Sequence, residues 1–364
     1  MKYLNEYRDA DLIKKLSAEL SAIPSPNKRI TLMEVCGTHT MAIARFGLRQ
    51  LLPEWLRLVS GPGCPVCVTP NAYLDRVLAI GQLPGVILTT FGDMLRVPGS
   101  YSSLEKEKAR GRDVRVVYSP LDAVALAEKN PGKEVVFLGV GFETTAPTIA
   151  GSILQARKRG VENYSVLCAH KTMPGPMEVL AAGEEVEIDG FICPAHVSAI
   201  IGSESYRFLA EKYGKACVVT GFEPVDILQG ILMLVRQIQA GKPTVENQYK
   251  RVVHPRGNRQ AQAILERVFE PCDAEWRGIG MIPGSGLQLR KEFVKYDAGV
   301  MFSVEVPPTR ENPGCICGKV MKGVAEPTDC RLFGKACTPE NPVGACMVSS
   351  EGTCAAAYRY RPIK

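Results

Sequence analysis

Short apolar runs rich in β-branched residues alternate with helix-compatible stretches, and this alternation limits the possible fold more than any other feature of the chain. Eight such runs, each bounded by turn residues, occur at 30–36, 56–61, 85–90, 114–119, 134–140, 164–169, 190–194 and 216–221. Strands that alternate with helices form parallel sheets. The sequence therefore predicts an α/β fold with helices on both faces of its sheets.

The eight runs form two sets of four that resemble each other. VCGTHTMAIA (35–44) aligns with VGFETTAPTIA (140–150) after one residue of slippage, and GVILTTFGD (85–93) aligns with GFICPAHVS (190–198). VRVVYSPLDAVAL aligns in the same way with ACVVTGFEPVDIL. We interpret this pattern as an internal duplication; the alternative is a chance resemblance among buried strands.

The duplication predicts three domains, namely two similar α/β domains at 1–120 and 121–222 and a third domain at 223–364. In the third domain, DILQGILMLVRQIQA is typical of a helix, and VENQYKRVVHPRGNRQAQAILERVF is typical of a further pair of helices. Beyond Pro307 the chain is rich in Pro, Gly and Cys. We expect this mostly irregular and helical domain to be held together through its cysteines.

Charge and hydropathy exclude several classes of protein. The chain has 44 Lys and Arg against 38 Asp and Glu, a net charge of +6 over 364 residues, which is too dilute to predict binding to nucleic acid or to an anionic membrane. It has no apolar run long enough to span a bilayer. The polar N-terminal sequence MKYLNEYRDADL does not resemble a signal peptide, so a cytoplasmic protein is predicted.

Cysteine is unusually abundant, with 13 residues in total and six of them between Cys315 and Cys354. Without a secretion signal, this odd number does not fit an extracellular disulfide framework. Cys315, Cys330, Cys337 and Cys354 are separated by 14, 6 and 16 residues, which is not the spacing of zinc knuckles. Four thiolates at irregular spacing suit a [4Fe–4S] cluster. Zinc and unrelated thiols are the alternatives.

Four further cysteines form two candidate redox pairs. Cys317 and Cys346 remain within the C-terminal segment, where they can form a disulfide that a neighbouring cluster reduces or re-forms; packing is the alternative role. Cys64 and Cys67 form a C-x-x-C pair in GPGCPVC, which favours redox chemistry over metal binding or a structural role.

The motif CGTHT directly follows the first predicted strand. Cys36 would lie at the start of a helix, where the helix dipole lowers the pKa of a thiol. His39 can stabilise the thiolate. A lone cysteine at this position can be structural, but Gly37, Thr38 and Thr40 are not core residue types and favour a functional site.

Polar residues at the ends of other predicted strands suggest a cleft between the two sheets, because sites form at the carboxyl ends of parallel strands. GVGFET lacks the third glycine of a dinucleotide fingerprint, which is replaced by Thr144, and no P-loop motif occurs, so ATP hydrolysis is not expected. Glu143 and His196 are candidate proton-transfer or hydrogen-bonding groups around the cleft, as are Asp93 and His170. Each of these residues can instead be structural.

CGTHT, GPGCPVC, GFETTAP, PAHVSAIIG and the C-terminal cysteine motif occur in one order from about residue 30 to the end, and together they resemble HypD, a family of [NiFe]-hydrogenase maturation proteins. The resemblance implies two similar α/β domains and a third domain with a [4Fe–4S] cluster. It also implies that the chain, with the small partner HypC, holds the iron that becomes the Fe(CN)2CO centre of the hydrogenase large subunit. Cyanide would come from HypE, which makes it from carbamoyl phosphate supplied through HypF.

The same resemblance assigns roles to individual residues. Cys36 is similar to the cysteine that binds iron together with the N-terminal cysteine of HypC. Cys64 and Cys67 are similar to the dithiol of the central cleft. The resemblance also makes Cys315, Cys330, Cys337 and Cys354 the cluster ligands. It makes Cys317 and Cys346 a redox disulfide, similar to that of ferredoxin–thioredoxin reductase.

The expected function is that of a maturation scaffold with redox activity, rather than that of a turnover enzyme. HypE presents cyanide as a thiocyanate, so its release as cyanide anion needs two electrons, which thiols and a cluster can deliver. Two alternatives stay open. One is a thiol–disulfide reductase in which Cys36 carries no iron, and the other is a binding protein with a purely structural cluster.

Overall fold

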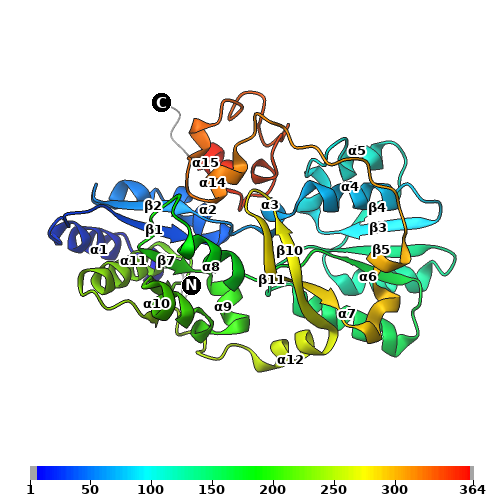
Figure 1. Ribbon diagram of the computed structural model, residues 1–364, viewed down its shortest axis with the longest axis horizontal. Coiled ribbons are helices and arrows are strands. Elements are labelled where there is room, and N and C mark those ends of the chain that lie inside the picture. The colour runs from blue at the N-terminus through cyan, green and yellow to red at the C-terminus, as the bar shows by residue number, and fades with distance from the viewer. Residues whose placement is uncertain (1–5, 361–364) are drawn as a thin grey trace.

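Two parallel sheets lie side by side in the computed structural model, which describes residues 6–360 (Figure 1). Sheet A has the strand order β2-β1-β7-β8-β9 and sheet B has the order β4-β3-β5-β6. The strands of sheet A are β1 (Ile30–Glu34), β2 (Leu56–Ser60), β7 (Gly190–Cys193), β8 (Ala216–Val219) and β9 (Val245–Asn247). Those of sheet B are β3 (Val86–Thr90), β4 (Val114–Val116), β5 (Glu134–Gly139) and β6 (Tyr164–Cys168).

Helices cover both faces of each sheet, as the sequence predicts. Alternate strand residues point to opposite faces, so Leu32 packs in one core and Met33 in another. The outer face of sheet A is covered by α1 (Ala10–Ala22), α2 (Gly37–Arg45) and α11 (Pro224–Gln239), and that of sheet B by α6 (Pro120–Lys129) and α7 (Ala146–Arg159).

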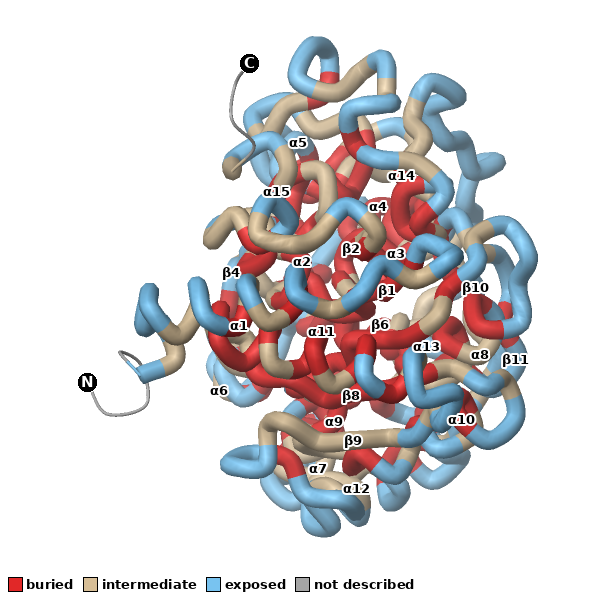
Figure 2. The backbone as a smooth tube through the Cα atoms, turned by 90° about the vertical axis from the view of Figure 1, so that its left-hand side faces the viewer, coloured by how far each residue is buried: buried red, intermediate tan, exposed pale blue. Residues whose placement is uncertain are grey.

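The inner faces of both sheets share one continuous core, and in Figure 2 most strands of the two sheets are buried while many of the surrounding loops are exposed. Helices that contribute to this core are α3 (Pro65–Val68), α4 (Asn71–Ile80), α5 (Leu104–Ala109), α8 (Pro174–Ala182), α9 (Ala195–Ile201) and α10 (Arg207–Tyr213). Short 3-10 turns lie at Glu6–Arg8, Leu48–Leu51, Gly92–Arg96 (η3) and Ser203–Tyr206.

Strand pairing follows a different division of the chain from the predicted ranges 1–120 and 121–222. Sheet A combines β1 and β2 with β7 and β8, whereas sheet B combines β3 and β4 with β5 and β6. In the sequence alignment β1 is equivalent to β5 and β3 to β7, so the spatial orders β2-β1-β7-β8 and β6-β5-β3-β4 are the same. Each sheet therefore combines strands from both predicted repeats, because the connections from β2 to β3 and from β6 to β7 cross between the sheets.

The region after residue 222 also differs from the prediction. The predicted helix at 226–240 is α11, but its apolar residues pack on sheet A, and β9 is the edge strand of that sheet. The predicted helix pair contains only one helix, α12 (Arg259–Val268). It is followed by an antiparallel hairpin that the sequence analysis does not predict, formed by β10 (Phe269–Trp276) and β11 (Gly280–Leu289).

The rest of the chain runs over sheet B and returns to sheet A. After η5 (Lys291–Tyr296) and α13 (Ala298–Met301), an extended segment leads to the cysteine-rich tail, which we define as residues 315–360. The tail contains α14 (Cys317–Met321), η6 (Pro327–Asp329), η7 (Ala345–Met347) and α15 (Thr353–Tyr360), and α15 packs against α2 (Figure 1). None of the helices in residues 6–360 has the length and apolar character that a membrane crossing requires.

Candidate functional site

A cleft of about 360 Å³ lies where the carboxyl ends of the strands of both sheets meet, as predicted. Its walls come from the segments that follow β1, β2, β3, β5 and β7, together with one residue of the tail. Cys36, Thr38, Gly63, Asp93, Thr144, Thr145, His196 and Glu351 are among its lining residues.

Cys36, which lines this cleft, is the buried N-cap residue of α2. A Cβ atom on Gly63 would lie 2.4 Å from the backbone nitrogen of Cys36, so only glycine lets the GPGCPVC loop pack here. The backbone N–H groups of His39 and Thr38 act to lower the pKa of the Cys36 thiol. Burial and the nearby carboxylate of Glu351 outweigh them and raise this pKa to about 11. The prediction of a lowered thiol pKa is therefore wrong.

The imidazole of His39 points away from Cys36, which corrects the predicted role of this side chain. Its Nε2 lies 2.9 Å from Thr220 Oγ1 and 3.0 Å from the carbonyl oxygen of Gly221. Burial lowers the pKa of His39 to about 4, so the ring is neutral at pH 7. His39 therefore acts on the Cys36 thiol through its backbone N–H and not through its imidazole.

Two residues of the tail form hydrogen bonds with residues that line the cleft, and the sequence analysis does not single them out. Thr38 Oγ1 donates a hydrogen bond to Glu351 Oε1 at 2.6 Å, on the side of sheet A. Ser349 Oγ donates to Asp93 Oδ2 at 2.9 Å, on the side of sheet B. The segment 349–351 therefore connects the two α/β units across the cleft. The only sequence signal for it was its position inside the C-terminal cysteine motif.

Glu143 and His170, which are predicted to lie around the cleft, do not line it. Glu143 is 3% exposed and does not line the cleft; its Oε1 accepts a hydrogen bond from the backbone N–H of Met173 at 2.9 Å. Burial raises the pKa of Glu143 to about 7. His196 does line the cleft, with its ring 4.2 Å from that of Phe222. His170 is buried elsewhere, with Nδ1 3.0 Å from Cys168 Sγ.

The predicted thiol pairs from the two ends of the chain are in contact. All 13 cysteines lie within the described residues and all are free thiols. The thiol of Cys346 is within hydrogen-bonding reach of the thiols of Cys317 and Cys67, and Cys67 is also in contact with Cys64. Hydrogen bonds with Cys346 and Cys64, together with burial, raise the pKa of Cys67 well above its usual value. A continuous series of thiols thus runs from the tail to the C-x-x-C motif.

All six cysteines of the tail line one small cavity. The surroundings of these cysteines show whether the tail is suited to an iron–sulfur cluster. The other lining residues are almost all apolar, and the backbone N–H of Val343 donates to Cys337 Sγ at 3.3 Å. Thiolate donors in apolar surroundings with hydrogen bonds to sulfur suit such a cluster. Within residues 6–360 no three His, Cys, Asp or Glu side chains converge closely enough to hold a single metal ion.

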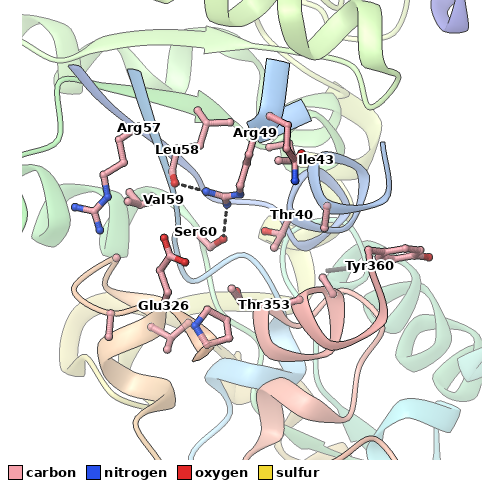
Figure 3. A pocket seen from close by; sticks show the side chains of 18 residues that line it. Thr40, Ile43, Arg49, Arg57, Leu58, Val59, Ser60, Glu326, Thr353 and Tyr360 are labelled. Carbon is pink, nitrogen blue, oxygen red and sulfur yellow. Dashed lines mark hydrogen bonds between the residues drawn. The ribbon is translucent and has the colours of Figure 1, made fainter. Parts of the chain in front are cut away.

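A second pocket, of about 340 Å³, lies where the tail packs on the edge of sheet A (Figure 3). Thr40 and Ile43 of α2 line one side, and Thr353 and Tyr360 of α15 line another. Arg49 hydrogen-bonds to the carbonyl oxygen of Leu58 and pairs at 3.0 Å with the buried carboxylate of Glu34. This pocket contains no thiol, so it is separate from the thiol series.

Fold and site together define a class of protein: a pair of parallel α/β units whose cleft contains a buried cysteine and is joined by thiols to a cysteine-rich tail. A family model named HypD, described as "Hydrogenase formation hypA family", matches residues 11–361. The chain belongs to this HypD family of hydrogenase maturation factors.

Relatives match over almost their full length. The chain is 48% identical to the hydrogenase maturation factor HypD of Rhizobium leguminosarum bv. viciae, over 99% of this chain and 96% of the relative. It is 46% identical to the HypD of Cupriavidus necator, over 100% and 98%, and 45% identical to that of Escherichia coli K12, over 99% and 98%.

Proposed function

We propose that this chain is the scaffold on which the iron of the Fe(CN)2CO centre of [NiFe]-hydrogenase receives its cyanide ligands. The observation that supports this most is the thiol series from the tail to the C-x-x-C motif, in which the thiol of Cys346 is within hydrogen-bonding reach of those of Cys317 and Cys67. Such a series places reducing groups beside the cleft that contains Cys36.

In this proposal the iron is cargo, and Cys36 is one of its ligands. Cys36 is a buried, protonated thiol at neutral pH, so iron binding displaces its proton. A soft thiolate suits iron that also carries strong-field ligands such as cyanide. HypC supplies the other protein ligand through its N-terminal cysteine. The cleft volume of about 360 Å³ leaves room for the iron with small ligands.

The cysteine pairs supply the electrons for cyanide release. HypE presents an S-bound thiocyanate, and its S–C bond breaks when two electrons enter it. Oxidation of Cys64 and Cys67 to a disulfide provides two electrons and two protons, which yields the free HypE thiol and hydrogen cyanide. Exchange with the tail thiols then returns Cys64 and Cys67 to the reduced form, because Cys346 is in contact with Cys67.

Cys315, Cys330, Cys337 and Cys354 would hold a [4Fe–4S] cluster in the cavity of the tail. When bound, this cluster would supply electrons one at a time. Its place next to Cys317 and Cys346 would allow two such electrons to be collected as a dithiol.

Complementation of a cell that lacks its own HypD tests the proposal. We expect the wild-type chain to restore [NiFe]-hydrogenase activity, and Cys36→Ala and Cys67→Ala each to restore less than about 1% of it. Cys272→Ala, on the β10–β11 hairpin away from the cleft, is the matched control and should restore activity. Full activity of Cys36→Ala would contradict the proposal.

A further inference from the structure

A further cavity, of about 640 Å³, is lined in part by tail thiols and has more cationic than anionic side chains. Four of its lining side chains are cationic, and Glu311 is its single carboxylate. The cationic residues are Arg277, Arg310, Lys319 and Lys322, of which Lys322 is paired with the carboxylate of Glu185. Cys315 and Cys317 also line the cavity, whereas Cys36 and the cleft residues do not. Positive charge of this density attracts small anions.

Arg277 is the best-defined cation of this cavity. It lies in the turn of the β10–β11 hairpin and is only 6% exposed. Its Nε donates to the carbonyl oxygen of Thr69 at 2.9 Å, and its Nη1 lies 3.8 Å from Glu311. Its Nη2 is buried and has no partner within residues 6–360. An unpartnered buried donor on a charged group is costly, so a ligand that accepts this hydrogen bond is favoured.

Asn71 provides a second unpartnered group at the same cavity. Its Nδ2 donates to the carbonyl oxygen of Arg310 at 2.7 Å, which fixes the orientation of the amide. Its Oδ1 is therefore an acceptor, and it is buried with no partner in the described part of the chain. A fitting ligand carries both an anionic acceptor and a hydrogen-bond donor.

Two glycines bring Arg277 next to the tail thiols. A Cβ atom on Gly278 would lie 2.3 Å from the Cα atom of Gly318, and one on Gly318 would lie 2.8 Å from that of Gly278. Only glycine at both positions allows the hairpin turn to touch the backbone directly after Cys317. The cationic group of Arg277 and the thiol of Cys317 therefore line the same cavity.

We propose that this cavity binds a small thiol that carries a carboxylate group, and that this thiol reduces the Cys317–Cys346 disulfide as a source of electrons besides the tail cluster; the inference rests on the proposed function. The carboxylate accepts hydrogen bonds from Arg277 in place of Glu311, whose side chain is 57% exposed and free to move. The thiolate attacks Cys317 Sγ, the Cys317–Cys346 bond breaks, and Cys346 leaves as a thiolate. A second thiol molecule attacks the mixed disulfide, which releases the oxidised small disulfide and the Cys317 thiol.

The reverse reaction provides the test. The full-length reduced protein is incubated with glutathione disulfide, with neutral 2-hydroxyethyl disulfide or with cationic cystamine. Mass spectrometry then measures the rate of mixed-disulfide formation at Cys317. We expect glutathione disulfide to react at least about tenfold faster than the neutral probe at low salt, with cystamine the slowest. The advantage should shrink in high salt, which screens the cationic residues.

Variants of opposite charge change sharpen the test. Arg277→Gln and Lys319→Gln should reduce the preference for the anionic probe, whereas Glu311→Gln should increase it. Lys319 is exposed, so Lys319→Gln keeps the test valid where Arg277→Gln fails to fold. Arg290→Gln, at an exposed arginine directly after β11, is the control and should leave the preference unchanged.

Equal rates for the three probes, or a preference that none of the charge variants alters, would overturn this inference. Complementation separates the two proposals. If the preference is absent while Cys36→Ala still abolishes maturation, the reductant site is wrong and the scaffold function stands. If Cys36→Ala matures hydrogenase normally, the proposed function fails whatever the probes show.

Discussion

Gly63 shows how a single residue sets the geometry of the cleft. Its backbone lies against that of Cys36, and Gly37 N–H donates to the carbonyl oxygen of Gly63 at 3.0 Å. This contact holds the loop that carries Cys64 and Cys67 next to the N-terminus of α2. The position of the dithiol therefore depends on the absence of a side chain at residue 63.

Substitution of Gly63 by Ala should move this loop, because a Cβ atom 2.4 Å from a backbone nitrogen cannot be accommodated. We expect a loss of about 2 kcal/mol or more in the free energy of unfolding, measured with urea, and faster alkylation of Cys67. Gly132→Ala is the control, because a Cβ atom there meets no heavy atom within 4 Å. Equal stability of the two variants would show that the loop adapts freely.

Glu143 gives stability a pH dependence whose sign follows from its raised pKa. The folded state holds the proton up to about pH 7, whereas the unfolded state releases it near pH 4.5. The protonated form thus stabilises the fold fully below pH 4.5, and this contribution is lost as the pH rises to 7. The loss amounts to about 3 kcal/mol at most. His39 acts in the opposite direction, because its lowered pKa destabilises the fold as the pH falls from 6.5 to 4.

Glu143→Gln should isolate the carboxyl contribution. We expect the stability of this variant relative to the wild type to rise steadily between pH 4.5 and 7, in urea titrations at several pH values. Because both proteins retain His39, its contribution cancels in the difference. A difference that stays constant with pH would mean that Glu143 is ionised in the folded protein.

At the scale of elements, the tail has little core of its own. Its small apolar cluster contains Cys337, Met347 and Ala355, with partly buried neighbours. If the cysteines hold a [4Fe–4S] cluster, anaerobically purified protein should be brown and contain about four iron and four sulfide per chain. Cys337→Ala should bleach the absorption and make the tail sensitive to protease, whereas Cys272→Ala should do neither. A colourless protein with one zinc would contradict the cluster.

The sequence predicts most elements because their signals are local. Apolar β-branched runs predict the eight strands from β1 to β8, and the apolar periodicity of 226–240 predicts α11. The hairpin β10–β11 has weaker signals: its burial alternates within β10, but Pro271 and three glycines interrupt the apolar pattern of β10 and β11. Packing of this hairpin against the rest of the chain is a tertiary effect that a local pattern does not contain.

At the scale of the whole molecule, the sequence shows which predicted strands resemble each other but not how the two sheets share them. Strands β3 and β4 resemble β7 and β8, so sequence similarity alone does not indicate which of these two pairs joins β1 and β2 in sheet A. The same limit applies to the site. Cys36 and Cys64 stand out by their motifs, whereas the contacts of Glu351 with Thr38 and of Cys346 with Cys67 join residues about 300 positions apart and depend on the complete fold.

The central claim is that Cys36 holds an iron that acquires cyanide within this cleft, and an infrared spectrum tests it most directly. The chain is purified anaerobically with its small partner, as wild type, as Cys36→Ala and as the control Cys272→Ala. We predict the stretching bands of iron-bound CN and CO in the wild type and the control. In Cys36→Ala these bands should be absent while the visible absorption of the tail cluster persists. Bands of undiminished strength in Cys36→Ala would contradict the account.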